Sequence, residues 1–270
     1  AVNDVVDKLE FEMLDTDVDD LDVTDTDEVL RFGEMNRPDI IINCSGMTDI
    51  SSCEENPSQA FKVNALGARN LAIVAAKMQA KMVQLSTDDV FDGKSTEPYT
   101  EFDITNPGTV YGKSKLAGEN YVKEFTTKHF IVRSTWVYGK GQNFINGFLK
   151  KVDAGEQLSI ASDQFGSPTS ANELARFLLH LVHTSEYGTY HATNKGVCSR
   201  YAFAQEILKM TGKTASMQPV PTVMSDFSKV RPAYAVLDNF IMSMVPIYDF
   251  PDWQDSLREY LEERGLYHAE

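Results

Sequence analysis

Apolar and polar positions follow two periods along this chain, one typical of buried strands and one typical of helices. Short apolar runs bounded by polar or turn residues predict strands at Phe11–Leu14, Ile40–Cys44, Lys81–Ser86 and Phe130–Ser134. Between them, apolar residues recur at helical spacing and predict helices at Thr26–Met35, Pro57–Met78 and Lys113–Phe125. This alternation predicts a parallel sheet with right-handed crossovers and helices on both faces.

The pattern loosens into shorter elements beyond about residue 140. Helical periods continue at Glu173–His183, Tyr201–Thr211 and Asp252–Arg264, and Thr189–Thr193 predicts one further strand. No internal repeat, low-complexity tract or flexible linker separates the two parts of the sequence. We therefore predict a Rossmann-like doubly wound α/β fold with a smaller second lobe interwoven with the first.

The start of the chain departs from such a fold. A dinucleotide-binding sheet opens with a strand and a glycine-rich turn, yet no GxGxxG or GxxGxxG occurs here. Ala1–Glu10 is typical of a helix already under way, so we expect the first strand and glycine loop, roughly fifteen to twenty residues, to be absent before Ala1. Three interpretations stay open: a segment outside this chain, a truncated inactive paralogue, and a binding module.

Charge and cysteine usage narrow the class of protein. Lys and Arg number 25 against 40 Asp and Glu, a net charge of -15, which argues against nucleic acid or an anionic membrane as partner. No signal peptide and no run of about 18 apolar residues occurs. Cys44, Cys53 and Cys198 have no CxxC or metal-ligand spacing, so we expect free thiols, with Cys44 buried at a strand end. A cytoplasmic protein without a metal site is expected.

The residues with catalytic chemistry are Tyr111 and Lys115, four apart at the start of a predicted helix. That spacing places both side chains on one helix face, where an ammonium would lower the phenol pKa from about 10. Such a phenol exchanges protons with a substrate oxygen. Taken alone, such a pair is more often part of a solvated helix face. Ser86 and Thr87 follow a strand, where a helix cap or turn is the alternative.

Together, Thr87, Tyr111 and Lys115 resemble the Ser/Thr–Tyr–Lys triad of the extended short-chain dehydrogenase/reductases. Longer strings resemble one family of these enzymes, the dTDP-4-dehydrorhamnose reductases, from Asp22 to the Trp253 helix. These strings are LSTDDVFDG, NPGTVYGKSKLAGE, VRSTWVYG, SDQFGSPT and KVRPAYAVLDN. The resemblance implies reduction of the C4 keto group of dTDP-6-deoxy-L-lyxo-4-hexulose to dTDP-L-rhamnose by NADPH or NADH. Tyr111 would donate the proton, Thr87 would hydrogen-bond the same oxygen, and Lys115 would bind the nicotinamide ribose.

The resemblance also implies binding residues. For the cofactor, beside Tyr111 and Lys115, these are Asp17, Asp22, Val23, Cys44, Ser45, Gly46, Asn64 and Ser86. Asp17, with Asp15 as the alternative, would accept the adenosine ribose hydroxyls and favour NADH. For the dTDP-sugar, these are Thr48, Ile50, Thr87, Trp136, Asn143, Gln164 and Arg231. Core packing is the alternative for Trp136, and a surface position is the alternative for Arg231.

The family pattern is not followed everywhere. Asp89 stands where family members usually have tyrosine, and Gly46-Met47 where they more often have alanine followed by an aromatic residue or histidine. We expect an NAD(P)-binding Rossmann domain over residues 1–140 plus about 168–193, and a sugar-nucleotide lobe over 141–167 and 194–270. The alternatives are a regulatory subunit, as in the methionine adenosyltransferase β subunit, and a sugar-nucleotide epimerase or dehydratase. A homodimer is one open arrangement.

Overall fold

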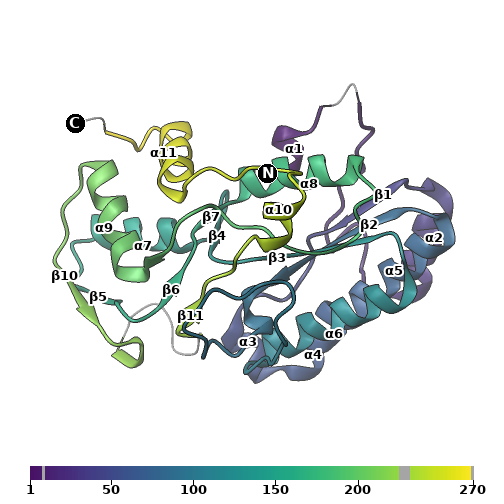
Figure 1. The fold of residues 1–270 in the computed structure, drawn as a ribbon, viewed down its shortest axis with the longest axis horizontal. Helices are drawn as coiled ribbons and strands as arrows, with labels where there is room; N and C mark the ends of the chain where they lie inside the picture. The colour runs from purple at the N-terminus through teal and green to yellow at the C-terminus, as the bar shows by residue number, and fades with distance from the viewer. Residues whose placement is uncertain (8–9, 225–231, 269–270) are drawn as a thin grey trace.

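A parallel four-stranded sheet organises the first part of the chain (Figure 1). The structure is a computed structural model that describes residues 1–7, 10–224 and 232–268. The strands lie in the order β1-β2-β3-β8. Their bounds are Ile40–Asn43 for β1, Lys81–Thr87 for β2, His129–Ser134 for β3 and Gly188–His191 for β8. Helices cover both faces of this sheet, and the predicted Rossmann-like α/β fold is confirmed.

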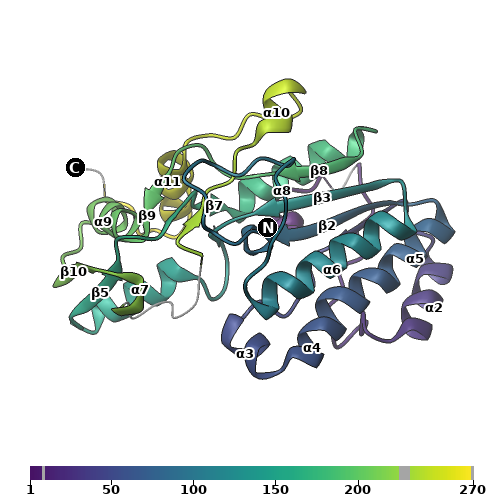
Figure 2. The same ribbon diagram turned by 60° about the horizontal axis from the view of Figure 1, so that its bottom comes forward.

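Alternation along the central strands explains the two helical layers. Met82 and Ile131 point to one face, where they pack against α2 (Thr26–Asn36), α5 (Ala68–Met78) and the side of α6 (Val110–Phe125) that carries Val122. Val83 and Phe130 point to the other face and pack against α8 (Ala171–His183). Since both faces are buried, the middle of β1, β2 and β3 is rich in apolar residues, as expected for a parallel sheet. Figure 2 shows α5 and α6 side by side beneath the sheet, with α8 on the opposite face.

The second lobe has its own core and lies beyond the carboxyl ends of the sheet (Figure 1). Its helices are α7 (Phe144–Asp153), α9 (Arg200–Thr211) and α11 (Trp253–Glu263). Three small sheets pair β5 (Leu158–Ala161) with β10 (Met217–Val220), β4 (Val137–Tyr138) with β7 (Thr169–Ser170), and β6 (Phe165–Gly166) with both β9 (Cys198–Ser199) and β11 (Tyr234–Ala235). A 3-10 turn, η3 (Thr222–Met224), follows β10.

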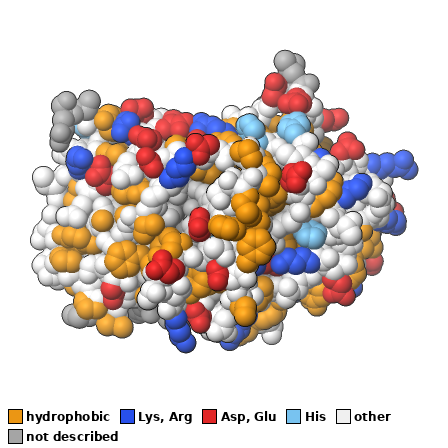
Figure 3. Space-filling view, in the orientation of Figure 1, with side chains coloured by type: hydrophobic (Ala, Val, Ile, Leu, Met, Phe, Trp, Pro, Cys, Tyr) orange, Lys and Arg blue, Asp and Glu red, His pale blue; other side chains and the backbone are white. Residues whose placement is uncertain are grey.

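The domain boundaries stay a prediction. One segment of the predicted second lobe packs against the four-stranded sheet instead. Within the predicted lobe 194–270, α10 (Phe240–Met244) returns to the sheet, where Met242 and Phe250 pack in the same cluster as Phe177 of α8. Figure 3 shows hydrophobic side chains gathered near the middle of the face that carries α10. Phe240, at the start of α10, is 37% exposed, and its ring lies 6.0 Å from that of Phe102.

The N-terminal region differs from the prediction. Residues 11–14 form no strand, and α1 covers only Val2–Val5. A strand requires a neighbour for its backbone, but Phe11 packs its ring 5.3 Å from that of His183 on α8. Cys44 was predicted to be buried and is exposed, because β1 ends at Asn43 and the chain then turns out of the sheet. Among the described residues, no helix is long and apolar enough to cross a membrane.

The predicted helix at Pro57–Met78 is present with one local change. It consists of α4 (Pro57–Phe61), a π-helical turn η1 (Lys62–Gly67) and α5. The short helix α3 (Ile50–Glu55) precedes it and is capped by Asp49, whose side chain accepts a hydrogen bond from the Ser52 amide. A π-helical turn is rare and is often found at functional sites.

Candidate active site

The start of α6 fixes the position of Tyr111 and Lys115. Thr109 caps the helix, with its Oγ1 accepting a hydrogen bond of 2.9 Å from the Gly112 amide. Gly112 allows a close approach, because a Cβ at this position would lie 2.0 Å from the Asp89 carbonyl oxygen. The first turn of α6 therefore packs directly on η2 (Asp88–Val90), the turn that follows β2. Tyr111 and Lys115 are buried there, one helical turn apart.

Thr87 ends β2 and belongs to a buried hydrogen-bond chain. Its Oγ1 donates to Asp88 Oδ1 over 2.9 Å and accepts from the Asp89 amide over 3.2 Å. The other oxygen of Asp88 accepts a hydrogen bond of 2.9 Å from Thr135 Oγ1, beyond the end of β3. These hydrogen bonds hold the Thr87 hydroxyl at the carboxyl edge of the sheet, where ligands bind in this type of fold.

Burial changes the acidity of Lys115. Desolvation lowers its pKa to about 8, and the Glu119 carboxylate acts in the opposite direction, as would a Cys44 thiolate. Lys115 also approaches the loop after β1, since a Cβ on Gly46 would lie 3.8 Å from Lys115 Nζ. The Lys115 ammonium therefore lies beside the Gly46 loop, one helical turn beyond Tyr111.

Asn64, on the π-helical turn, joins that loop to α6. Its Oδ1 accepts a hydrogen bond from the Met47 amide over 2.8 Å. Its Nδ2 donates to the Met47 carbonyl and to Ser114 Oγ, each over 2.9 Å. Because these bonds occupy the amide within the protein, Asn64 braces the site and its predicted contact with a cofactor would be indirect.

Three other predicted cofactor residues have side chains or backbone engaged elsewhere. Ser86 Oγ donates to Glu119 on α6 over 2.5 Å. Asp22 Oδ1 accepts from the Thr24 amide, and its hydrogen bonds with Thr24 lower the pKa of the Asp22 carboxyl. The Val23 carbonyl accepts from Asn70 Nδ2 over 3.0 Å.

The remaining cofactor candidates differ in their surroundings. Ser45 donates from both its amide and its hydroxyl to Asn43 Oδ1, at 3.0 and 2.6 Å. It lies with Cys44 and Gly46 directly after β1, beside the end of β2. Asp17 is exposed and follows no strand, contrary to prediction, and its Oδ1 accepts from the Val18 amide over 2.7 Å. The role of all these residues stays a prediction.

The predicted sugar-binding residues divide between two places. Ile50, at the start of α3, packs against the cluster that contains Tyr111, and Thr48 is exposed just before it. Trp136 follows β3 with a left-handed backbone (φ 46°). The Arg200 guanidinium carbon lies 3.5 Å from the centroid of the Trp136 ring. On Gly166, a Cβ would come within 2.6 Å of the ring. The Trp136 indole is half-buried. The predicted ligand contact and its alternative, core packing, both stay predictions.

The other three predicted sugar-nucleotide residues have different outcomes. Gln164 is 2 % exposed, and its Nε2 finds no hydrogen-bond partner in the part of the chain that the structure describes. An unpaired buried amide is costly, so this group is suited to a ligand. Asn143 caps α7, accepting from the Asn146 amide and donating to the Gly139 carbonyl. Arg231 lies outside the described residues.

Two buried charged residues near the site were not predicted from the sequence. Arg133 on β3 donates from Nε and from one terminal nitrogen to the two carboxylate oxygens of Glu119, at 2.9 and 2.8 Å. The signal was present, because Glu119 continues the four-residue spacing of Tyr111 and Lys115. Arg133 lies within a predicted strand that is otherwise mostly apolar. A buried arginine needs a paired anion, so its position also indicated a buried carboxylate nearby.

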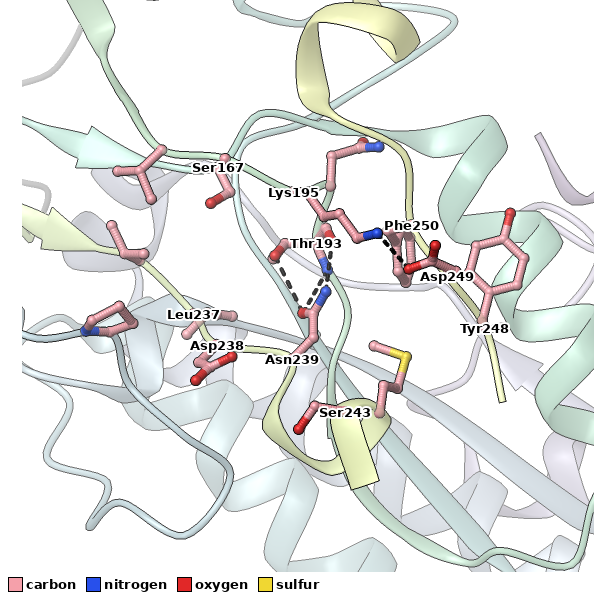
Figure 4. A pocket seen from close by; sticks show the side chains of 16 residues that line it. Ser167, Thr193, Lys195, Leu237, Asp238, Asn239, Ser243, Tyr248, Asp249 and Phe250 are labelled. Atoms are coloured by element: carbon pink, nitrogen blue, oxygen red, sulfur yellow. Dashed lines mark hydrogen bonds and ion pairs between the residues drawn. The ribbon is translucent and has the colours of Figure 1, made fainter. Parts of the chain in front are cut away.

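A separate pocket of about 460 Å³ opens beyond the end of β8 (Figure 4). Residues 193–197, 236–239 and 248–250 form much of its wall. Asn239 braces it through hydrogen bonds with the Thr193 backbone, and an ion pair of 2.5 Å joins Lys195 to Asp249. Thr87, Tyr111 and Lys115 do not line this pocket.

Comparisons with known proteins agree with this geometry. Residues 1–265 match the family described as the RmlD substrate binding domain. A dTDP-4-dehydrorhamnose reductase structure from Clostridium acetobutylicum ATCC 824 is 40% identical, with a TM-score of 0.95 over 98% of this chain and 94% of that one. The Bacillus anthracis str. Ames enzyme of the same name, in complex with NADP, is 35% identical, with a TM-score of 0.94 over 97% and 94%.

A curated relative of different name is similar as well. The spore coat polysaccharide biosynthesis protein SpsK of Bacillus subtilis (strain 168) is 38% identical over 85% of this chain and 81% of its own length. The match to the RmlD domain spans both lobes, and the structural similarity extends over nearly the whole chain. This chain therefore belongs to the RmlD family, that of the dTDP-4-dehydrorhamnose reductases.

Proposed function

We propose that this protein reduces the C4 keto group of dTDP-6-deoxy-L-lyxo-4-hexulose to dTDP-L-rhamnose with NADPH or NADH. The observation that carries the proposal is the buried pair Tyr111 and Lys115, packed on the turn that follows Thr87. The names of the similar structures, one of them in complex with NADP, support the same reaction. The three free cysteines support a cytoplasmic location.

The residues beside Lys115 fit a nicotinamide cofactor. Gly46 leaves a space that a side chain would fill. A Cβ at this position would lie 3.1 Å from Asn64 Oδ1 and 3.8 Å from Lys115 Nζ. Cys44, Ser45, Gly46 and Lys115 would hold the cofactor. When bound, the cofactor supplies the hydride.

The chain's own residues manage the proton. Tyr111 gives its phenolic proton to the C4 oxygen as negative charge develops there. Thr87 donates a hydrogen bond to the same oxygen, after its rotatable hydroxyl turns from Asp88. Lys115, as an ammonium, stabilises the phenolate that Tyr111 becomes. Burial strengthens this attraction because little water screens it.

The test removes only the Tyr111 hydroxyl. Tyr111→Phe should lower kcat by roughly 100-fold or more, since the proton donor is lost. Binding of NADPH, followed by its fluorescence, should stay near the wild-type value. Tyr121→Phe is the matched control on the same helix, where the ring packs against Phe125, and it should retain full activity.

Two outcomes would contradict the proposal. Full activity of Tyr111→Phe would exclude Tyr111 as the proton donor. A folded wild-type protein that does not consume reduced cofactor with the keto sugar nucleotide would exclude the reductase. Conversion of a sugar nucleotide without net consumption of reduced cofactor would instead identify an epimerase or dehydratase.

A further inference from the structure

One face of α6 carries a row of ionisable side chains. Tyr111, Lys115, Glu119 and Lys123 follow one another at four-residue intervals, which places each beside the next along the helix. Tyr111, Lys115 and Glu119 are buried, and the Lys123 side chain is 39% exposed at the outer end. Only the first two members have a role in the proposed reaction.

Glu119 is held as a buried anion. The Arg133 guanidinium binds both carboxylate oxygens, and Ser86 Oγ donates to Oε1 over 2.5 Å. Burial opposes the charge, but the Arg133 hydrogen bonds and positive charge outweigh it and lower the pKa of Glu119. Lys123 adds a weaker contact of 3.7 Å. A fixed negative charge therefore lies one helical turn beyond Lys115.

Several groups around Lys115 are titratable, but they differ in charge. Tyr111 precedes it on α6, and Cys44 lies after β1; both are ordinarily neutral near pH 7. Arg133, on β3, is positive but is engaged with Glu119. Among the groups identified as acting on Lys115, Glu119 is thus the anion that offsets the cost of its burial.

We propose that Glu119, kept ionised by Arg133, is a positioning residue that holds Lys115 as an ammonium beside Tyr111 at neutral pH. This inference rests on the proposed reductase function. Glu119 acts on the reaction only through Lys115, because its carboxylate is fully enclosed by protein.

The direction of the pH effect follows from the charges. The pKa of Lys115, about 8 with Glu119 in place, sets the pH above which the ammonium and the reduction rate decline. A neutral side chain at position 119 leaves desolvation unopposed, so the same decline should begin at lower pH. A purely structural role would lower stability without moving this limb of the pH profile.

The experiment compares kcat against pH for wild type, Glu119→Gln and Lys123→Gln. Glutamine keeps the shape and can still accept from Ser86, so Glu119→Gln changes mainly the charge. We expect its alkaline limb to move down by about one pH unit, a roughly tenfold loss of kcat on that limb, with little change in KM for the sugar nucleotide. Lys123→Gln, which removes a half-exposed charge from the same carboxylate, should leave the limb in place.

A second readout does not depend on turnover. Competitive labelling with acetic anhydride, followed by mass spectrometry, gives the pKa of Lys115 in each protein. If the wild type is inactive while the pKa of Lys115 falls in Glu119→Gln, the proposed function fails and the electrostatic role of Glu119 stands. An unchanged pKa of Lys115 and an unchanged alkaline limb overturn the inference.

The single variant leaves Arg133 buried without its anion, which is destabilising. If Glu119→Gln does not fold, the double variant Glu119→Gln/Arg133→Gln removes both charges together. Lys115 still lacks its anion in the double variant, so the same downward shift is expected. A wild-type profile in a folded double variant overturns the inference equally.

Discussion

Buried His191 should make the stability of this protein depend on pH. The side chain is fully buried at the end of β8. Its Nδ1 lies 3.0 Å from the Tyr99 carbonyl oxygen and 3.1 Å from that of Asp238, so Nδ1 carries a proton and donates. Its Nε2 has no hydrogen-bond partner among residues 1–7, 10–224 and 232–268. Burial, together with the Arg133 charge, lowers the pKa of His191 to about 3.

The magnitude follows from proton linkage. The pKa of an unfolded histidine is about 6.5. Below that pH the unfolded chain binds a proton at His191, whereas the folded protein does not. The contribution of His191 to the free energy of unfolding is therefore fully present above pH 6.5 and declines as the pH falls toward 3. At about 1.4 kcal/mol per pH unit for one proton, the loss between pH 7.5 and 5.0 should be about 2 kcal/mol.

The perturbation that isolates this effect is His191→Asn. The asparagine amide can still donate near the position of Nδ1, but it does not titrate. Urea unfolding at pH 7.5 and 5.0, both above the sequence pI of 4.7, gives the free energy of unfolding of each protein. Carboxylates contribute equally to both proteins, so the wild type should lose about 2 kcal/mol more than the variant over this interval. Equal losses in the two proteins would refute the assignment of a buried neutral imidazole.

Two further substitutions test the framework of the site. Gly112→Ala should remove most reductase activity and lower the melting temperature, because its Cβ would lie 2.0 Å from the Asp89 carbonyl oxygen; a variant with wild-type kcat would contradict this close packing. Asn64→Ala should destabilise the protein by about 2–4 kcal/mol in urea unfolding, because the Met47 backbone groups and Ser114 lose buried hydrogen bonds. A loss below about 0.5 kcal/mol would show that Asn64 is not a brace.

Much of the fold was predictable because its central strands are buried on both faces. Continuous apolar runs therefore marked β1, β2 and β3, and helical periods marked the helices between them. The prediction at residues 11–14 was wrong, since an apolar run alone does not supply a neighbouring strand. Phe11 packs against His183 at a tilt instead, while Met13 and Leu14 are 39% and 53% exposed.

The site was predictable to the extent that its residues are close in sequence. The spacing of Tyr111 and Lys115 placed them on one face of α6, as found. Arg133 and Glu119 meet across a β-strand and a helix, a contact that depends on how α6 packs on the sheet. Trp136 and Arg200 are farther apart, and sequence spacing carries no information about such a stack.

The π-helical turn at Lys62–Gly67 acts as a phase shift in an otherwise continuous helix. Each π turn takes up about one residue more than an α turn, so the residues after it are rotated by roughly 100° relative to an unbroken α-helix. Before and within the turn, Ala60 and Asn64 face the first half of α6. After it, Leu71 and Ala75 face the sheet core. One continuous helical segment can thus pack against α6 before the turn and against the sheet core after it. Deletion of one residue from the turn would rotate α5 relative to α4, so that only one of these two contacts could be kept.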